Sequence, residues 1–479
     1  MKKKSIRIIE IILLIILLTL PISLIAINSE LIVGDELWNF QNIVKMINGN
    51  KMYVDCNIII TPVFYLIGYC FVKLVTGTIL GFRVYNIIIF TVLLLLCFFL
   101  FKSLKINSYK SILYTLLILL FIMPYISVGA NYNILAVLFF ILGVVIFINK
   151  DKIKYYNLIQ GLIIFICFFS KQNIGIYYGI AITINEIFEH KKESIHYIIR
   201  EFIVAIICTF VAILIMHITG CFEGFLNYAF FGMGEFATKN LSLQDVVGVV
   251  IIGYIIIAIC SYILAFLLSI QNEKLAKDLK ILGIFSILLN FTILPIANLY
   301  HTSFAILLNI VIFIYIFENL LLNKLNNKII IGISICTIYT FINIYGIICG
   351  YRASKNVKMV NNIYFSSNIC YELNEKLIEV TKYMKQKEKE GIDVVCISAD
   401  APLYMTYLGK NHGKLDLCFT GNLGYGGKDD VIEELKTLNN IEILINSNDY
   451  WQEINDIKKY VKENYRLVDT IQDLNLYKK

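Results

Sequence analysis

The chain has 479 residues and a formal net charge of +7, and 58% of its residues are hydrophobic against 16% charged. This composition excludes an ordinary soluble domain and indicates a polytopic α-helical membrane protein, which needs lipid as its solvent for most of its length. The lysines and arginines lie between apolar segments, where they set topology. They therefore give no support for nucleic acid as a partner.

The first element expected in chain order is a membrane span. Met1 to Ile27 has a basic head and an apolar run, and no small-residue cleavage site precedes Glu30, so we expect a retained span rather than a signal peptide. Apolar length predicts about eleven spans between Ile8 and Cys349. Every second loop is basic, which predicts a multi-pass cell-membrane protein with a cytoplasmic amino end and an extracytoplasmic carboxyl end.

One apolar segment, Ile58 to Val75, is expected to lie at the interface instead of crossing the membrane. Counting it as a span would move every later basic loop to the outer side, against the positive-inside rule. Its Tyr65, Tyr69 and Lys73 suit the headgroup level. We therefore place it as an interfacial helix in a first outer loop, residues 28–83.

Composition changes sharply after Cys349, which predicts two domains, residues 1–350 in the membrane and residues 351–479 outside it. In the second part, β-type runs at 393–398, 415–419 and 441–445 alternate with polar helical stretches. This alternation favours a small extracytoplasmic α/β domain with a largely parallel sheet. A glycine-rich segment, Gly421 to Gly427, lacks the spacing of a phosphate-binding loop and is interpreted as a turn between strand and helix.

Asp35 and Glu36 form an acidic pair just past the end of the first span. Carboxylates at that position face water above an apolar surface, which suits chemistry on a lipid-borne substrate. The alternative for Asp35 is an ordinary capping residue for a helix from Glu36 to Ile47.

The first outer loop resembles a known family of enzymes. It contains Gly34-Asp35-Glu36-Leu37-Trp38, then Gly49-Asn50-Lys51-Met52-Tyr53-Val54-Asp55, then Thr61-Pro62-Val63-Phe64-Tyr65, then Gly81-Phe82-Arg83. In order and approximate spacing these segments resemble the GT-C-fold membrane glycosyltransferases of family 39, which include protein O-mannosyltransferases and aminoarabinose transferases. The resemblance covers roughly Ile8 to Cys349, with its specific motifs in the first hundred residues.

This resemblance implies an inverting transfer of a sugar from a polyprenyl-phosphate donor to an extracytoplasmic acceptor, which is a glycan, a lipid or a protein. Asp35 takes the family position of the general base, with Glu36 beside it to orient the loop. Arg83 and Lys171 are the candidate phosphate ligands at the outer ends of spans, and the alternative for each is a snorkelling anchor.

Further residues are assigned to substrate binding on the same resemblance. His301 lies between two late spans, where relatives place a polar donor-binding residue, and a structural histidine is the alternative. Asp55 and Tyr53 are assigned to substrate binding, and the alternative is that they only hold the turn of the loop together. Asn133, with Asn131, stands where many relatives carry a second aspartate.

This departure removes the acidic residue that would bridge two outer loops through a metal, so we predict neither a metal nor a cofactor. Two other functions stay open. A transporter or flippase of lipid-linked saccharides would carry charges deep within its spans. An inert membrane anchor for an outer binding domain would have no cavity around Asp35.

Overall fold

The computed structural model describes residues 2–32, 34–239, 249–271, 273–295, 298–320, 328–355, 357–416, 418, 422–446 and 452–479. The chain is mostly helical up to Lys355 and carries its strands after that point. The longer helices of the first part are α1 (Lys2–Asn28), α2 (Asp35–Ile47), α3 (Val63–Val75), α4 (Ile79–Ser103), α5 (Ser108–Ile122), α6 (Tyr132–Ile148), α7 (Tyr156–Ser170), α8 (Gln172–His190), α9 (Ser194–Ile218), α12 (Val249–Gln271), α13 (Glu273–Asn290), α15 (Leu307–Leu320) and α16 (Lys328–Lys355). Short elements connect them, namely η1 (Met123–Val128), η2 (Lys150–Lys152), η3 (Lys191–Glu193), α10 (Phe222–Gly224), the π-helix η4 (Phe225–Gly232), α11 (Met233–Lys239), η6 (Phe291–Ile293) and α14 (Leu299–Ala305).

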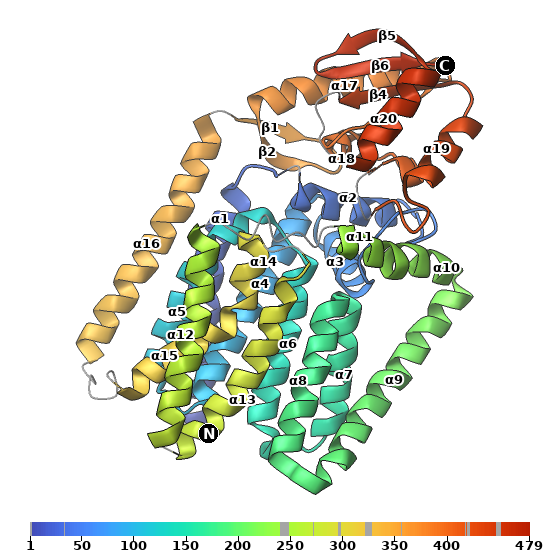
Figure 1. Cartoon of the computed structure of the whole chain (residues 1–479). Helices are drawn as coiled ribbons and strands as arrows, with labels where there is room; N and C mark the ends of the chain where they lie inside the picture. The colour runs from blue at the N-terminus through green and yellow to red at the C-terminus, as the bar shows by residue number, and fades with distance from the viewer. Residues whose placement is uncertain are drawn as a thin grey trace.

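Several of these helices are apolar enough to cross a membrane. Five stretches of the described chain have both the length and the hydropathy for it, namely Ile9–Asn28, Ile79–Ser103, Ser108–Val128, Gln172–Ile218 and Lys328–Tyr351. The stretch Gln172–Ile218 contains α8 and α9, which turn back on each other at η3 (Figure 1). Helices α14 and α15 form a further candidate that is bent by 46°. The expected number of about eleven spans stays a prediction.

The part of the chain after Lys355 lies at one end of the helical bundle, and we call it the outer domain for that position (Figure 1). Its elements are β1 (Val357–Asn361), β2 (Ser366–Cys370), α17 (Tyr371–Lys389), β3 (Asp393–Ile397), α18 (Ala401–Leu408), η8 (Gly413–Leu415), α19 (Gly427–Thr437), β4 (Ile441–Asn446), α20 (Gln452–Asn464), β5 (Arg466–Ile471) and β6 (Leu474–Lys478). Strands β1 and β2 pair by themselves, and the larger sheet has the order β3-β4-β6-β5.

The expectation of a largely parallel sheet is wrong. Among the described strands of this sheet, only β3 and β4 pair in parallel, while β6 runs antiparallel to both β4 and β5. The last two strands form a hairpin, which the alternation of strands and helices earlier in the domain did not indicate. The predicted strand at 415–419 begins in η8 and a bend at Asp416, and its residues 417 and 419 lie outside the described residues.

The sheet of the outer domain has two buried faces. Val394 and Cys396 of β3 join the large core that continues into the helical bundle, whereas Val395 and Ile397 join a second core against α19 and α20. This alternation follows from the period of two along a strand. One face of the sheet therefore packs in the core shared with the bundle, and the other face packs against the helices of the outer domain.

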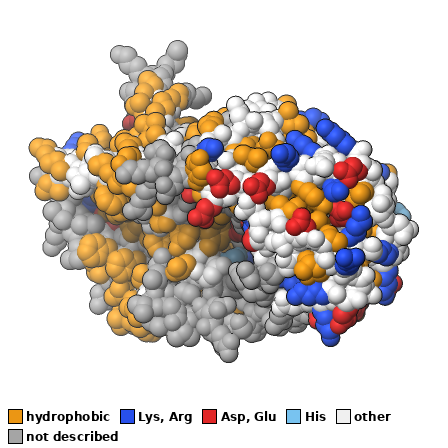
Figure 2. Space-filling model, turned by 90° about the horizontal axis from the view of Figure 1, so that it is seen from above, with side chains coloured by type: hydrophobic (Ala, Val, Ile, Leu, Met, Phe, Trp, Pro, Cys, Tyr) orange, Lys and Arg blue, Asp and Glu red, His pale blue; other side chains and the backbone are white. Residues whose placement is uncertain are grey.

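Helices α2 and α3 lie between the bundle and the outer domain (Figure 1). Helix α2 is amphipathic, and its Leu37, Phe40 and Ile43 are fully buried. Seen from the outer-domain end, charged side chains gather on the outer domain and hydrophobic ones over the helices (Figure 2). The acidic pair at the start of α2 thus sits where the apolar and polar parts of the molecule meet.

Candidate active site

Asp35 is the first residue of α2, and its carboxyl group is both accessible and desolvated. The capping position is taken by Gly34, and no side-chain capping bond is present, so Asp35 does not serve as the helix cap. Solvent reaches its side chain, yet burial among surrounding protein atoms raises the pKa of the carboxyl above its ordinary value. From these two properties together we infer that Asp35 lines a recess, and the polar side chains around it are called the Asp35 recess.

A row of hydrogen bonds connects Asp35 with α6 and α14. The amide of Asn131 donates to the Asp35 carboxylate at 3.3 Å, and the Asn131 oxygen accepts from the Asn133 amide at 2.8 Å. The same Asn133 amide lies 3.2 Å from Nε2 of His301. Nδ1 of His301 is 2.8 Å from the side-chain oxygen of Asn298, so Nδ1 carries the proton and Nε2 accepts. The neutral ring is thereby held in one orientation.

Lys171 brings a positive charge to this row. It lies in the turn between α7 and α8, and its ammonium is 5.9 Å from the ring centre of Tyr132, the residue between Asn131 and Asn133. Burial lowers the pKa of Lys171 to about 7, and its charge acts on His301. Among the described residues, no carboxylate pairs with this ammonium. An unpaired, desolvated cation of this kind is suited to bind an anion.

Several polar atoms around the row have no hydrogen-bond partner within the described chain. They include the hydroxyls of Ser170, Tyr300 and Thr302 and the side-chain oxygen of Asn133. Tyr300 also interacts electrostatically with Asp35. Because buried polar groups nearly always find partners, these atoms indicate a wall that water or a ligand completes.

Arg83 and Glu36 form a buried ion pair beside the recess. Nε and Nη2 of Arg83 donate to the two carboxylate oxygens of Glu36 at 2.8 and 3.2 Å. Nη1 donates to the backbone carbonyls of Ile27 and Ser29 at 3.1 and 2.9 Å. All three nitrogens of the Arg83 guanidinium therefore already donate hydrogen bonds within the protein, which argues against the predicted role of Arg83 as a phosphate ligand. The pair ties the end of α1 to α2 and α4. It also fixes the side chain of Glu36, which directly follows Asp35 in the chain.

Tyr53 and Asp55 stabilise the loop and do not join the row. The Tyr53 hydroxyl donates to the carbonyl of Ile60 at 2.5 Å, and its ring packs edge-on against Phe225. The Asp55 carboxylate accepts from the backbone amide of Lys51 at 2.7 Å. Of the residues predicted from sequence, the structure thus gathers Asp35, Asn133, Lys171 and His301 in one place.

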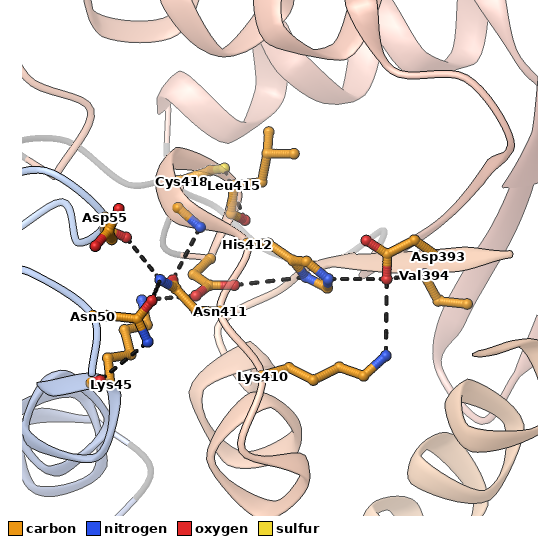
Figure 3. Close-up of polar contacts among 12 residues, drawn as sticks. Lys45, Asn50, Asp55, Asp393, Val394, Lys410, Asn411, His412, Leu415 and Cys418 are labelled. Carbon is orange, nitrogen blue, oxygen red and sulfur yellow. Dashed lines mark hydrogen bonds and ion pairs between the residues drawn. The ribbon is translucent and has the colours of Figure 1, made fainter. Parts of the chain in front are cut away.

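The outer domain is attached to the same loop by a buried polar contact. Lys45 of α2 pairs with Asp416 at 2.7 Å, and their side chains are 2% and 0% exposed. The Asn411 amide donates to the Asn50 side chain at 3.0 Å and to the backbone carbonyl of Asp55 at 2.8 Å. Figure 3 shows this contact between the two parts of the chain. Sequence reasoning missed Lys45 and Asp416, because nothing local marks a partner so distant in the chain.

The glycine-rich turn of the outer domain makes a second attachment. Its Tyr425 backbone amide donates to Asn227 of η4 at 2.8 Å. A Cβ atom added to Gly232 would lie 3.0 Å from Cα of Gly424, so the two glycines allow the backbones to approach closely. This segment therefore acts as a packing surface for η4.

The residues of the recess do not form an evident metal site. Asp35 is accompanied there by amides, hydroxyls and one cation, and no group of three metal-ligating side chains occurs among the described residues. Metal sites for hard cations use several carboxylate or carbonyl oxygens. We therefore derive no step through a metal.

Comparison with known proteins gives one informative likeness. No protein-family profile and no curated protein matches the sequence. The fold is similar to the crystal structure of the Archaeoglobus fulgidus oligosaccharyltransferase in complex with Zn and sulfate, with a TM-score of 0.51 and 9% sequence identity over 90% of this chain and 68% of that one. At this identity the likeness concerns the fold alone, and it is a likeness to a membrane glycosyltransferase of the GT-C class.

Proposed function

We propose that this protein is a membrane glycosyltransferase that moves a sugar from a polyprenyl-phosphate donor to an acceptor on the side of the outer domain. The observation that carries the proposal is the row of hydrogen bonds that begins at the Asp35 carboxyl, together with the Lys171 ammonium near Tyr132, which has no carboxylate partner among the described residues. The fold likeness supports the same class of reaction.

In the proposed reaction, a hydroxyl or amine of the acceptor attacks the anomeric carbon of the donor sugar. The new bond to that carbon forms as its bond to the phosphate oxygen breaks, so polyprenyl phosphate leaves and the configuration inverts. Asp35 takes the proton of the acceptor, for which its raised pKa is favourable. Lys171 stabilises the negative charge of the departing phosphate.

The remaining residues of the row have positioning roles in this proposal. Asn131 holds the Asp35 carboxylate, and Asn133 and His301 form the wall next to Lys171. The Arg83–Glu36 pair fixes the start of α2, which carries the base. An apolar recess of about 650 Å³ between α7, α8 and α9 includes Phe168 and Gly175, which flank Lys171 in the chain. A polyprenyl tail is the kind of ligand that such a surface accepts.

The test is transfer by the purified full-length protein in detergent or vesicles with a sugar linked to polyprenyl phosphate. Release of polyprenyl phosphate should fall about 10²- to 10⁴-fold for Asp35→Asn, the usual contribution of a general base. Asp55→Asn is the matched control, because it removes a carboxylate from the same loop outside the recess. Unchanged activity of the Asp35 variant would remove this residue from the mechanism.

One observation favours the transporter alternative. Glu186 of α8 and Glu201 of α9 are fully buried within the bundle, and both oxygens of Glu201 have no hydrogen-bond partner in the described chain. Buried carboxylates inside membrane helices often mark transport pathways. Movement of a fluorescent lipid-linked sugar across vesicles, lost in Glu201→Gln and kept in Asp35→Asn, would favour this second function over transfer.

A further inference from the structure

A second recess lies at the end of the helical bundle opposite the outer domain, where α7 begins and α8 turns into α9 (Figure 1). Its volume is about 390 Å³. Residues of η2, of the start of α7, of the end of α8 and of the start of α9 line it. Four separate elements thus build one hollow, so it is not a feature of a single exposed helix.

The lining of this recess is cationic. Lys150, Lys154 and Arg200 contribute three permanent positive charges, and Asp151 is the one acidic side chain in the lining. Lys154 and Arg200 have no carboxylate partner among the described residues, and the Lys154 ammonium lies 5.3 Å from the ring centre of Tyr155. Two unpaired cations at a hollow favour an anionic ligand that accepts hydrogen bonds.

Contacts within the protein hold Lys150, His190 and Tyr197 of the lining in place. Lys150 pairs with Glu189 at 3.2 Å and lies 2.9 Å from Nε2 of His190. The His190 ring stacks on Tyr197 with the ring centres 4.0 Å apart. Lys150 is therefore partly neutralised, and the charge left for a ligand comes from Lys154 and Arg200.

The neighbouring surface is apolar and faces outward. Leu158 of α7 is 54% exposed and Ile203 of α9 is 49% exposed. Because Ile203 follows Arg200 by three residues, the two side chains lie on the same side of α9. A ligand held by Arg200 would therefore have its remaining part beside apolar side chains that suit acyl chains.

We propose that this recess binds the phosphate-bearing headgroup of an anionic membrane lipid. Basic pockets between membrane helices recognise such headgroups through charge and hydrogen bonds. Ordinary snorkelling lysines need no hollow, whereas here tyrosines and asparagine line the space between the cations. A free phosphate has the same headgroup chemistry but gains nothing from Leu158 and Ile203.

The proposal can be tested by native mass spectrometry of the purified full-length protein with added phosphatidylglycerol. The variant is Lys154→Gln with Arg200→Gln. The control is Lys105→Gln with Lys192→Gln, which removes the same charge from exposed lysines that do not line the recess. Loss of two cations should weaken lipid binding by roughly twentyfold or more, while the control stays near the wild type.

Parallel arms separate the lipid from other ligands. Phosphatidylcholine should bind the wild type and the variant equally weakly, and inorganic phosphate at millimolar concentration should not displace the anionic lipid. Equal losses in the variant and the control would overturn the proposal, since binding would then follow total charge. Full displacement by inorganic phosphate would overturn the assignment to a lipid.

Discussion

Arg83 donates hydrogen bonds to both carboxylate oxygens of Glu36, at 2.8 and 3.2 Å, and the side chains of this pair are 3% and 1% exposed. This contact separates the roles of two adjacent acids. Glu36 pairs with Arg83 and thereby connects α1, α2 and α4, whereas its neighbour Asp35 faces the recess. The acidic pair visible in the sequence is thus one buried structural group and one accessible group.

Breaking this pair should destabilise the protein strongly. Arg83→Met leaves the Glu36 carboxylate buried without its counter-charge, which costs about 3 to 5 kcal/mol. The double variant Glu36→Leu with Arg83→Met removes both charges and should recover much of the loss. Thermal unfolding in detergent measures both effects, and a double variant no better than the single one would show that the pair is not the cause.

The titration of Asp35 and of Lys171 should make the rate of sugar transfer depend on pH. Asp35 must be ionised to act as a base, so kcat/KM should fall on the acid side at a pH above the ordinary aspartate value of about 4. Lys171 must be charged to hold phosphate, so kcat/KM should fall again as the pH rises through about 7. Lys171→Arg keeps its charge and should move the alkaline limb upward. An unmoved limb would exclude Lys171 as its origin.

The buried charge of Lys171 should lower the stability of the folded protein although the proposed reaction needs it. Burial lowers its pKa from 10.5 to about 7, so the folded state binds this proton less well than the unfolded state, and stability from this group rises with pH between those values. Lys171→Met should therefore stabilise the protein at pH 6, on the order of 2 kcal/mol after allowance for partial solvent access, with a smaller gain at pH 9. The same variant should lose transfer activity. Unfolding curves at both pH values test the sign.

The attachment of the outer domain can be tested at one glycine. In Gly232→Ala the new methyl group would lie 3.0 Å from both Cα of Gly424 and the backbone carbonyl oxygen of Asn227, so the contact between the glycine-rich turn and η4 has to open or shift. In Gly234→Ala a Cβ atom meets nothing within 4 Å, which makes it the matched control. Limited proteolysis should cut the Gly232 variant several times faster near residues 422–427. Equal rates for the two variants would argue against a packed turn.

The helices were the part of the fold most open to prediction, because apolar runs and basic loops follow directly from the lipid environment. The terminal hairpin was missed because the residues of β5 are mostly exposed and show no alternation of buried and exposed positions. In the site, Asp35, Asn133, Lys171 and His301 were named from a resemblance, and their proximity needed the tertiary structure. The partner of Arg83 could not be foreseen, since it depends on where the ends of three helices converge.

The buried bond between Lys45 and Asp416 sets a limit on how the chain can be divided. In a fragment that ends with α16, Lys45 of α2 would be uncovered and would lose its counter-ion, and Asp416 would be left in the same state in the isolated outer domain. Exchanging the outer domain for another one would succeed only if the newcomer supplied an acid at the same point. The two parts of the chain therefore contribute one charge each to a single buried ion pair.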